Sequence, residues 1–211
     1  MKILNLYAGI GGNRKLWGDS HQVTAIEMDK ETSNVYKKYF PNDTVINADA
    51  HQYLLEHYKE FDFIWSSPPC PTHSKLNFTR NGRGDSMKYP DMALYQQILF
   101  LHYWFKGLFV IENVIPYYKP LIPAQKLDRH LWWANFKMPY ANIKRPFEMA
   151  EATVKDYEDF LEYDLSEFKL KNKIKNLRNC VIPATGRHIL DSAERIYFSK
   201  QQTQGVLNFE L

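Results

Sequence analysis

The chain of 211 residues contains 45% hydrophobic and 24% charged residues, a composition typical of a globular protein with a buried core. Its formal net charge is only +3, which permits a nucleic-acid partner but does not require one. The two cysteines, Cys70 and Cys180, lack metal-ligand spacing, and no stretch reads as a signal peptide or a membrane span, so the sequence argues against a zinc protein, a secreted protein and a membrane protein.

Apolar strands and helices alternate along the first half of the chain. Strands are predicted at residues 2–8, 22–27, 44–47, 61–65 and 108–112, with a further aromatic strand within 125–136. Helices are predicted at residues 13–17, 29–40, 50–58 and 91–104. This alternation is typical of a parallel sheet with helices on both faces. The predicted fold class is therefore α/β, with a doubly wound, mostly parallel sheet.

A glycine-rich turn, Gly9-Ile-Gly-Gly12, follows the first predicted strand and allows backbone amides to approach a ligand closely. It lacks the Gly-x-Gly-x-x-Gly spacing expected for a pyrophosphate. Carboxylates end three of the strand units, at Glu27, Asp49 and Glu112. Each alone is explained as a helix cap or a solvated turn, but a carboxylate after the second strand also suits a ribose hydroxyl pair. Together with the glycines, they favour a nucleoside cofactor without phosphates, such as S-adenosylmethionine.

The stretch from Phe61 to Ser74 is the most informative part of the sequence. A buried strand ends there at Ser66-Ser67-Pro68-Pro69, because proline cannot donate to a sheet ladder. Cys70 is therefore expected in a rigid turn just past the carboxyl end of a strand, where open α/β sheets bind ligands. A buried structural cysteine is the alternative, and a reactive thiol would require activation by its neighbours.

Polar and charged segments interrupt the pattern after Cys70. Residues 75–90 are basic and show no apolar period, so a loop is predicted. Residues 148–167 are acidic and compatible with a helix, while 169–178 alternate lysine with apolar or amide residues. Charge runs of this kind are usually solvated faces, and the alternative for residues 75–88 and 169–178 is that they flank the expected cleft and contact phosphates.

In their order and spacing, these motifs resemble the DNA cytosine-5 methyltransferases across residues 3–136, about two thirds of the chain. The resemblance is carried by Asn5-Leu-Tyr-Ala-Gly-Ile-Gly-Gly12, Glu27, Asp49, Pro68-Pro-Cys70 with Ser74, Glu112-Asn-Val114 and Gln125-Lys-Leu-Asp-Arg129. It implies a Rossmann-like fold and S-adenosylmethionine as the cofactor. Five motifs in register argue against a chance resemblance.

The resemblance also implies catalytic roles. Cys70 would be the thiolate that adds to C6 of a flipped-out cytosine in DNA, so that C5 can attack the sulfonium methyl. Glu112 would hold or protonate N3 of the base, and Arg129 would orient Cys70 and the pyrimidine oxygen. Asn113 would fix the Pro-Cys loop. Because a free cysteine is mostly protonated at neutral pH, we expect either Arg129 or an array of loop amides to lower the pKa of Cys70.

Two further groups of residues follow from the same resemblance. The cofactor would be lined by Tyr7, Gly9, Gly11, Glu27, Asp49 and Pro69. The loop after Cys70 would close over the nucleic acid, whose contacts would come from Ser74, Lys75, Arg80, Arg83 and Lys88.

The chain departs from the family pattern in several places. Asn5, Pro71 and Leu127 stand where the family often has Asp, Gln and Arg. We find no Gly-Asn-Ser/Ala segment of the kind that usually closes the cofactor site near the C-terminus. A helix that opens at residues 187–193 is the candidate replacement for it.

The expected organisation has three parts. Residues 1–136 form the cofactor-binding and catalytic domain, 137–190 a reduced target-recognition region, and 191–211 a segment that packs back on the catalytic domain. Because the middle part is short, target recognition is expected to be minimal, to be shared with a protein partner, or to rest on the loop at 75–88.

Methylation of cytosine in DNA is the leading interpretation, by a cytoplasmic protein encoded by a bacterium or a phage. An RNA cytosine-5 methyltransferase is the alternative within the same chemistry, because Pro-Pro-Cys resembles tRNA-modifying relatives and a single-stranded target needs no duplex opening. A third interpretation is a catalytically weak homologue that binds cofactor or nucleic acid for a partner.

Overall fold

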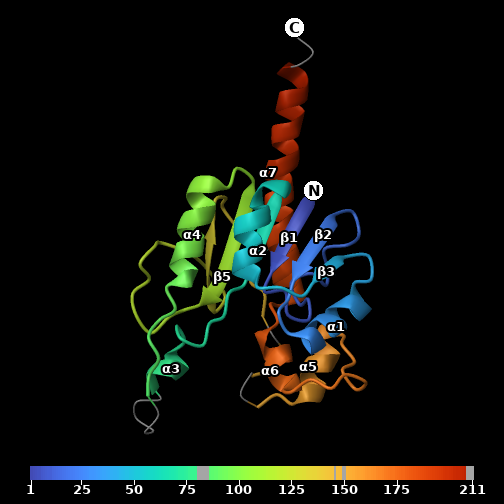
Figure 1. The fold of residues 1–211 in the computed structure, drawn as a ribbon, viewed down its shortest axis with the longest axis vertical. Helices are drawn as coiled ribbons and strands as arrows, with labels where there is room; N and C mark the ends of the chain where they lie inside the picture. Colours follow the sequence, from blue (N-terminus) through green and yellow to red (C-terminus); the bar gives the residue numbers. More distant parts are fainter. Residues whose placement is uncertain (80–85, 145, 149–150, 208–211) are drawn as a thin grey trace.

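A seven-stranded sheet organises the computed structural model, which describes residues 1–79, 86–144, 146–148 and 151–207 (Figure 1). The strands are β1 (Lys2–Leu6), β2 (Gln22–Ile26), β3 (Thr44–Ile46), β4 (Phe63–Ser66), β5 (Leu108–Val114), β6 (Gln125–Leu127) and β7 (His130–Ala134). Their order in the sheet is β3-β2-β1-β4-β5-β7-β6. The first five pair in parallel, whereas β7 is antiparallel to both β5 and β6. The predicted α/β class with a mostly parallel sheet is confirmed.

Helices connect and cover the strands. They are α1 (Lys30–Tyr39), α2 (Ala50–His57), the 3-10 turn η1 (Tyr58–Glu60), α3 (Lys75–Thr79), α4 (Ala93–Trp104), α5 (Val154–Leu161), α6 (Lys173–Asn179) and α7 (Pro183–Leu207). Two of them begin at capping carboxylates. Asp29 accepts from the Thr32 amide at the start of α1, and Asp49 accepts from the Gln52 amide at the start of α2, both at 2.8 Å. These caps satisfy amides that the helices themselves leave unpaired.

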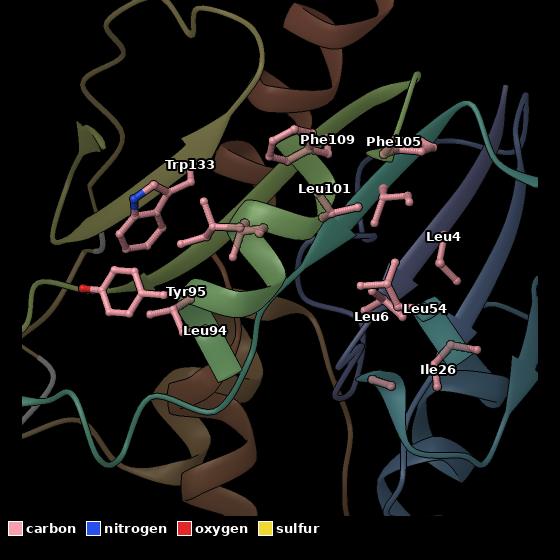
Figure 2. Packing of buried hydrophobic residues seen from close by; sticks show 14 of the residues in the cluster. Leu4, Leu6, Ile26, Leu54, Leu94, Tyr95, Leu101, Phe105, Phe109 and Trp133 are labelled. Atoms are coloured by element: carbon pink, nitrogen blue, oxygen red, sulfur yellow. The ribbon is translucent and has the colours of Figure 1, made fainter. Parts of the chain in front are cut away.

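The core lies on both faces of the sheet because successive strand side chains point to opposite sides. Figure 2 shows one face, where Leu4 and Leu6 of β1 pack with Leu54 of α2 and with Leu94 and Leu101 of α4. The opposite face is covered by α7 and the turn segment that follows β1. The members of that second cluster include Ile3, Trp17, Phe63, Trp65, Val110, Trp132, Ile189, Leu190 and Ala193.

The C-terminal part of the chain makes two kinds of contact with the sheet domain. Side chains of α5 and α6, among them Tyr157 and Leu177, pack with Ile10 and Val35 in a separate cluster. Helix α7 starts at Pro183, lies against the sheet and then extends past it (Figure 1). No helix in the described part of the chain is long and apolar enough to span a membrane.

Two local predictions are wrong. Residues 13–17 form consecutive turns rather than a helix, because the Arg14 guanidinium is drawn inward to Asp43 at 2.8 Å and Gly18 breaks the segment at φ +73°. The predicted loop at 75–90 begins with the short helix α3. The aromatic strand predicted within 125–136 is confirmed as β7, and it forms a hairpin with β6 that turns at Asp128, whose φ is +53°.

Candidate active site

Cys70 lies in the loop that follows β4, and Glu112 lies near the end of the neighbouring strand β5. The two strands pair in parallel, so both residues are at the carboxyl edge of the sheet. Asn113, which is 1% exposed, donates from Nδ2 to the carbonyl oxygen of Pro68 at 3.1 Å. As expected from the sequence, Asn113 ties the Pro-Cys loop to β5.

Arg129 comes from the turn between β6 and β7. The left-handed conformation of Asp128 reverses the chain there, and the antiparallel pairing of β7 with β5 brings the turn to the carboxyl end of β5. The positive charge of Arg129 acts on both Glu112 and Cys70. The structure therefore brings the three predicted catalytic residues together from three separate segments.

The Glu112 side chain is only 13% exposed, and its surroundings set its protonation. Burial raises the pKa of Glu112 from 4.5 to about 7, while the Ser67 hydroxyl, which donates to it, and the Arg129 charge oppose the rise. His130 Nε2 lies 3.4 Å from Glu112 Oε1. Near neutral pH this carboxyl is therefore able to either hold or release a proton.

The Cys70 thiol has a pKa above its ordinary value. Burial is the main cause, and the nearby carboxyl of Glu112 adds to it, whereas Arg129 and Lys175 act in the opposite direction. As expected, the charge of Arg129 acts to lower the pKa of Cys70, but burial and the Glu112 carboxyl outweigh it. In the free protein, the thiol is protonated at neutral pH.

The raised pKa of Glu112 predicts a pH-dependent effect of Glu112→Gln on stability. Between 4.5 and about 7, the folded state binds more protons at this group than the unfolded state, so its contribution to stability falls as pH rises through that window. Since Gln carries no charge, the variant should gain about 2–3 kcal/mol over wild type between pH 4 and pH 8. Urea unfolding at both pH values measures this difference.

Glu31→Gln is the control, because Glu31 is exposed on α1. Its stability difference from wild type should stay the same at both pH values within about 0.5 kcal/mol. A Glu112→Gln difference that is equally flat with pH would mean that Glu112 is solvated.

Glu27 lies at the end of β2 and closes the turn after β1. Its two carboxylate oxygens accept from the backbone amides of Gly9 at 2.9 Å and Asp29 at 2.8 Å. Burial raises the pKa of Glu27 despite these hydrogen bonds. A Cβ added to Gly9, whose φ is +57°, would meet nothing within 4 Å. Glu27 is thus held beside open space at the carboxyl edge of the sheet.

The other predicted cofactor residues differ in their surroundings. Tyr7 also has a left-handed backbone, and burial together with the negative charge of Asp49 raises its pKa to about 12. Asp49 caps α2, and Pro69 is exposed beside Cys70. Gly11, in contrast, does not face open space, since a Cβ there would lie 2.3 Å from a ring carbon of Phe40.

Ser74 stabilises the loop that carries Cys70. Its amide donates to the carbonyl oxygen of Cys70 at 3.1 Å, and its hydroxyl donates to that of Pro71 at 3.3 Å. Both of these groups are therefore engaged within the loop. The nucleic-acid contact expected of Ser74 stays a prediction.

The predicted nucleic-acid loop is closed at its base by Asn77, which is 3% exposed. The Asn77 side chain accepts from the amide of Lys88 at 3.1 Å and donates to the carbonyl of Lys88 at 2.8 Å. These hydrogen bonds join the two ends of the segment between Asn77 and Lys88. Lys75 and Lys88 are both exposed and lie next to this connection. Arg80 and Arg83 lie outside the described residues.

Three residues of this site were missed by the sequence reasoning. Ser67 precedes the two prolines and His130 follows Arg129, so both were within reach of the motifs that indicated the site. Lys175 belongs to α6, within the basic run at 169–178, but the sequence did not single it out as a neighbour of Cys70.

The comparison with known families agrees with this geometry. Residues 1–114, more than half of the chain, match the family model described as "C-5 cytosine-specific DNA methylase". The chain belongs to this cytosine-5 methylase family. Its members depend on S-adenosylmethionine, and the amide-held carboxylate of Glu27 beside the open space at Gly9 fits the nucleoside part of that cofactor.

Curated relatives of the chain are named tRNA (cytosine(38)-C(5))-methyltransferase. The one from Spodoptera frugiperda is 36% identical over 88 residues, which cover 39% of this chain and 25% of the relative. The one from Homo sapiens is 32% identical over 143 residues, which cover 65% of this chain and 30% of the relative. A solved structure of a Spodoptera frugiperda DNMT2 mutant is 30% identical over 54% of this chain and 35% of that one, with a TM-score of 0.37. The chain thus spans about a third or less of these relatives.

Proposed function

We propose that the chain transfers a methyl group from S-adenosylmethionine to C5 of cytosine in RNA, through a transient bond between Cys70 Sγ and C6 of the base. The observation that carries the proposal is the grouping of Cys70, Glu112 and Arg129 at one edge of the sheet. Membership of the cytosine-5 methylase family supports the reaction type. The names of the curated relatives support RNA as the substrate.

The three side chains divide the work of activating the base. The thiol of Cys70 gives its proton to solvent water and its sulfur bonds to C6, while Glu112 gives a proton to N3, so that negative charge does not build up on the ring. The Arg129 cation stabilises the thiolate and the pyrimidine oxygen. S-adenosylmethionine, when bound, supplies an electrophilic methyl group for C5. Loss of the C5 proton to solvent water, with cleavage of the Sγ–C6 bond and return of the N3 proton to Glu112, then releases 5-methylcytosine and the thiolate.

The pKa of Glu112 suits this role. A general acid works best when its pKa lies near the working pH, and burial brings Glu112 to about 7. Cys70 has the opposite disposition, because its raised pKa keeps the free thiol protonated. We infer that the Cys70 thiolate forms only when a cytosine fills the site, and that the thiol proton then passes to solvent water.

DNA is the second candidate substrate. The description of the matching family model names DNA, and the sequence motifs resemble the DNA enzymes. A base in a duplex must leave the stack before Cys70 reaches C6, whereas a base in an RNA loop is already accessible. The described recognition part, α5 and α6, is small, which favours the accessible base.

A labelling experiment separates these alternatives. Purified protein is incubated with tritiated S-adenosylmethionine and either unmodified tRNA transcripts or duplex DNA, and the product nucleosides are then separated. We expect labelled 5-methylcytosine from RNA. Label in DNA alone would overturn RNA in favour of DNA. Cofactor binding with no label in either nucleic acid would overturn the enzyme and leave a homologue that binds cofactor for a partner.

We propose the same three-part organisation that the sequence indicates. Residues 1–136 would hold the cofactor and the reacting groups, and 137–190 would contact the nucleic acid through α5 and α6. Residues 191–211 would support the sheet. Helices α5 and α6 pack against Ile10 of the glycine turn and against Val35 of α1. This packing supports a recognition part next to the cofactor. A protein partner that adds recognition surface fits the small size of this part.

Lys75 and Lys88 are proposed to contact phosphates, as are Arg80 and Arg83. Replacing both lysines with alanine should reduce the slope of log affinity against log salt by about 1–2, because each neutralised phosphate releases counterions. A salt series of RNA binding constants measures the slope. The matched control is a double alanine variant of Lys59 and Lys106, exposed lysines at the opposite edge of the sheet. Equal slopes for both double variants would place the phosphate contacts elsewhere.

A further inference from the structure

His130 is a second polar side chain held against Glu112. It is the first residue of β7, where it pairs with Val114, while Glu112 pairs with Trp132. His130 Nε2 lies 3.4 Å from Glu112 Oε1, and the two side chains are 15% and 13% exposed. No motif of the sequence indicated this close approach of two largely buried titratable side chains.

The orientation of the His130 ring is restrained by a neighbouring aromatic side chain. It packs edge-on against Trp132, with ring centroids 6.2 Å apart at an interplanar angle of 77°. Trp132 is itself fully buried and donates from Nε1 to the carbonyl oxygen of Leu127 at 3.3 Å. A ring held in this way can present one nitrogen to a partner without a further loss of side-chain entropy.

The groups around the Glu112 carboxyl come from three segments. The Ser67 hydroxyl follows β4, Cys70 lies in the Pro-Cys loop, and Arg129 and His130 come from the hairpin. Lys175 of α6 acts on Cys70 rather than on Glu112. With the exception of the thiol, these neighbours are hydrogen-bond donors or cations. Such surroundings favour the carboxylate that remains after Glu112 has given up its proton.

We propose that His130 is a positioning residue for Glu112, donating from Nε2 to Oε1 and so holding the carboxyl toward the base and stabilising it after proton transfer. This inference rests on the proposed function for its catalytic meaning, but the contact itself does not depend on it. An imidazole suits this role because Nε2 can donate to the carboxylate while Nδ1 can make a second hydrogen bond that orients the ring.

The consequence for protonation has a definite sign. A donor to the carboxylate favours the ionised form, so the proposed hydrogen bond from His130 would lower the pKa of Glu112 from where burial alone would set it. Removing the donor should raise the pKa, and Glu112 would then give up its proton less readily. Replacement by Gln keeps an N–H donor at a similar reach, whereas Phe keeps the ring shape without a donor.

The test compares His130→Phe with His130→Gln in two measurements. The first is the single-turnover rate on the RNA or DNA that wild type methylates, across pH 6 to 9. We expect His130→Phe to be slowed about tenfold at pH 7 and to lose activity on the alkaline side at a higher pH than wild type. His130→Gln should retain most of the rate and the wild-type profile.

The second measurement needs no activity. The stability gain from Glu112→Gln is followed from pH 4 to 9 with His130 present and with Phe in its place. With His130 the gain should level off near pH 7, and with Phe it should keep rising for at least about half a pH unit further. A gain that levels off at the same pH in both backgrounds would overturn the contact. If His130→Phe does not fold, the same comparison is made with His130→Gln and His130→Leu.

These outcomes separate the inference from the proposed function. A wild-type protein that methylates neither nucleic acid would contradict the proposed function, while the stability measurement would still decide the contact. An active wild type whose His130→Phe variant keeps the wild-type rate and profile would overturn the positioning role alone.

Discussion

Cys70→Ser is expected to reduce methyl transfer by more than about a hundredfold, equivalent to at least ~2.7 kcal/mol in the reaction barrier. A serine hydroxyl is a far weaker nucleophile toward C6 than a thiolate, because it stays protonated at neutral pH. Binding of S-adenosylmethionine should stay close to wild type, because the predicted cofactor contacts at Gly9 and Glu27 come from different strands. Single-turnover rates and calorimetry measure the two effects separately.

The control for this prediction is Cys180→Ser. Cys180 is buried beside α6, and its sulfur donates to the carbonyl oxygen of Asn176 at 3.4 Å, a hydrogen bond that a hydroxyl can also make. We expect wild-type turnover from this variant. If Cys70→Ser retained more than about a hundredth of the wild-type rate, the covalent mechanism would be wrong for this protein.

Gly11→Ala should cause a large loss of stability, about 2–4 kcal/mol in the free energy of unfolding. The added Cβ would lie 2.3 Å from a ring carbon of Phe40 and 3.0 Å from one of Tyr36, and φ at Gly11 is +88°. Both rings are buried and pack against each other, with centroids 4.8 Å apart and planes tilted by 57°, so neither can move away easily. Urea unfolding measures the loss.

Gly9→Ala is the matched comparison within the same turn. Its φ is also left-handed, but the added Cβ meets nothing within 4 Å, so we expect a loss of only about 1 kcal/mol. The variant should nevertheless bind S-adenosylmethionine more weakly, since the methyl group enters the open space beside Glu27. Equal losses of stability for the two variants would mean that Gly11 is not a packing position.

Local patterns in the sequence were sufficient to predict the sheet domain. The strand at Lys2–Leu6 and the helix capped by Asp29 depend on hydrophobic period and on a capping side chain, both of which lie within a few residues. The grouping of Cys70 with Glu112 followed from their positions after parallel strands, because the ends of such strands meet at one edge.

Non-local contacts explain what the sequence could not predict. The helix expected at 13–17 is absent because Arg14 pairs with Asp43, a partner 29 residues away. The contact between His130 and Glu112 depends on the register of β7 against β5, which no local pattern sets. The raised pKa of Cys70 depends on how deeply the loop is buried, and burial of a loop is not visible in its composition.

The most direct test of covalent cytosine methylation by Cys70 uses RNA that carries 5-fluorocytosine, in the presence of S-adenosylmethionine. Fluorine at C5 cannot leave as a proton does, so the Sγ–C6 bond cannot be cleaved once the methyl group has been transferred. We predict a stable protein–RNA complex whose formation requires the cofactor and whose crosslinked peptide contains Cys70. A protein that methylates ordinary RNA but forms no such complex, or forms it at another residue, would contradict the assignment of Cys70 as the nucleophile.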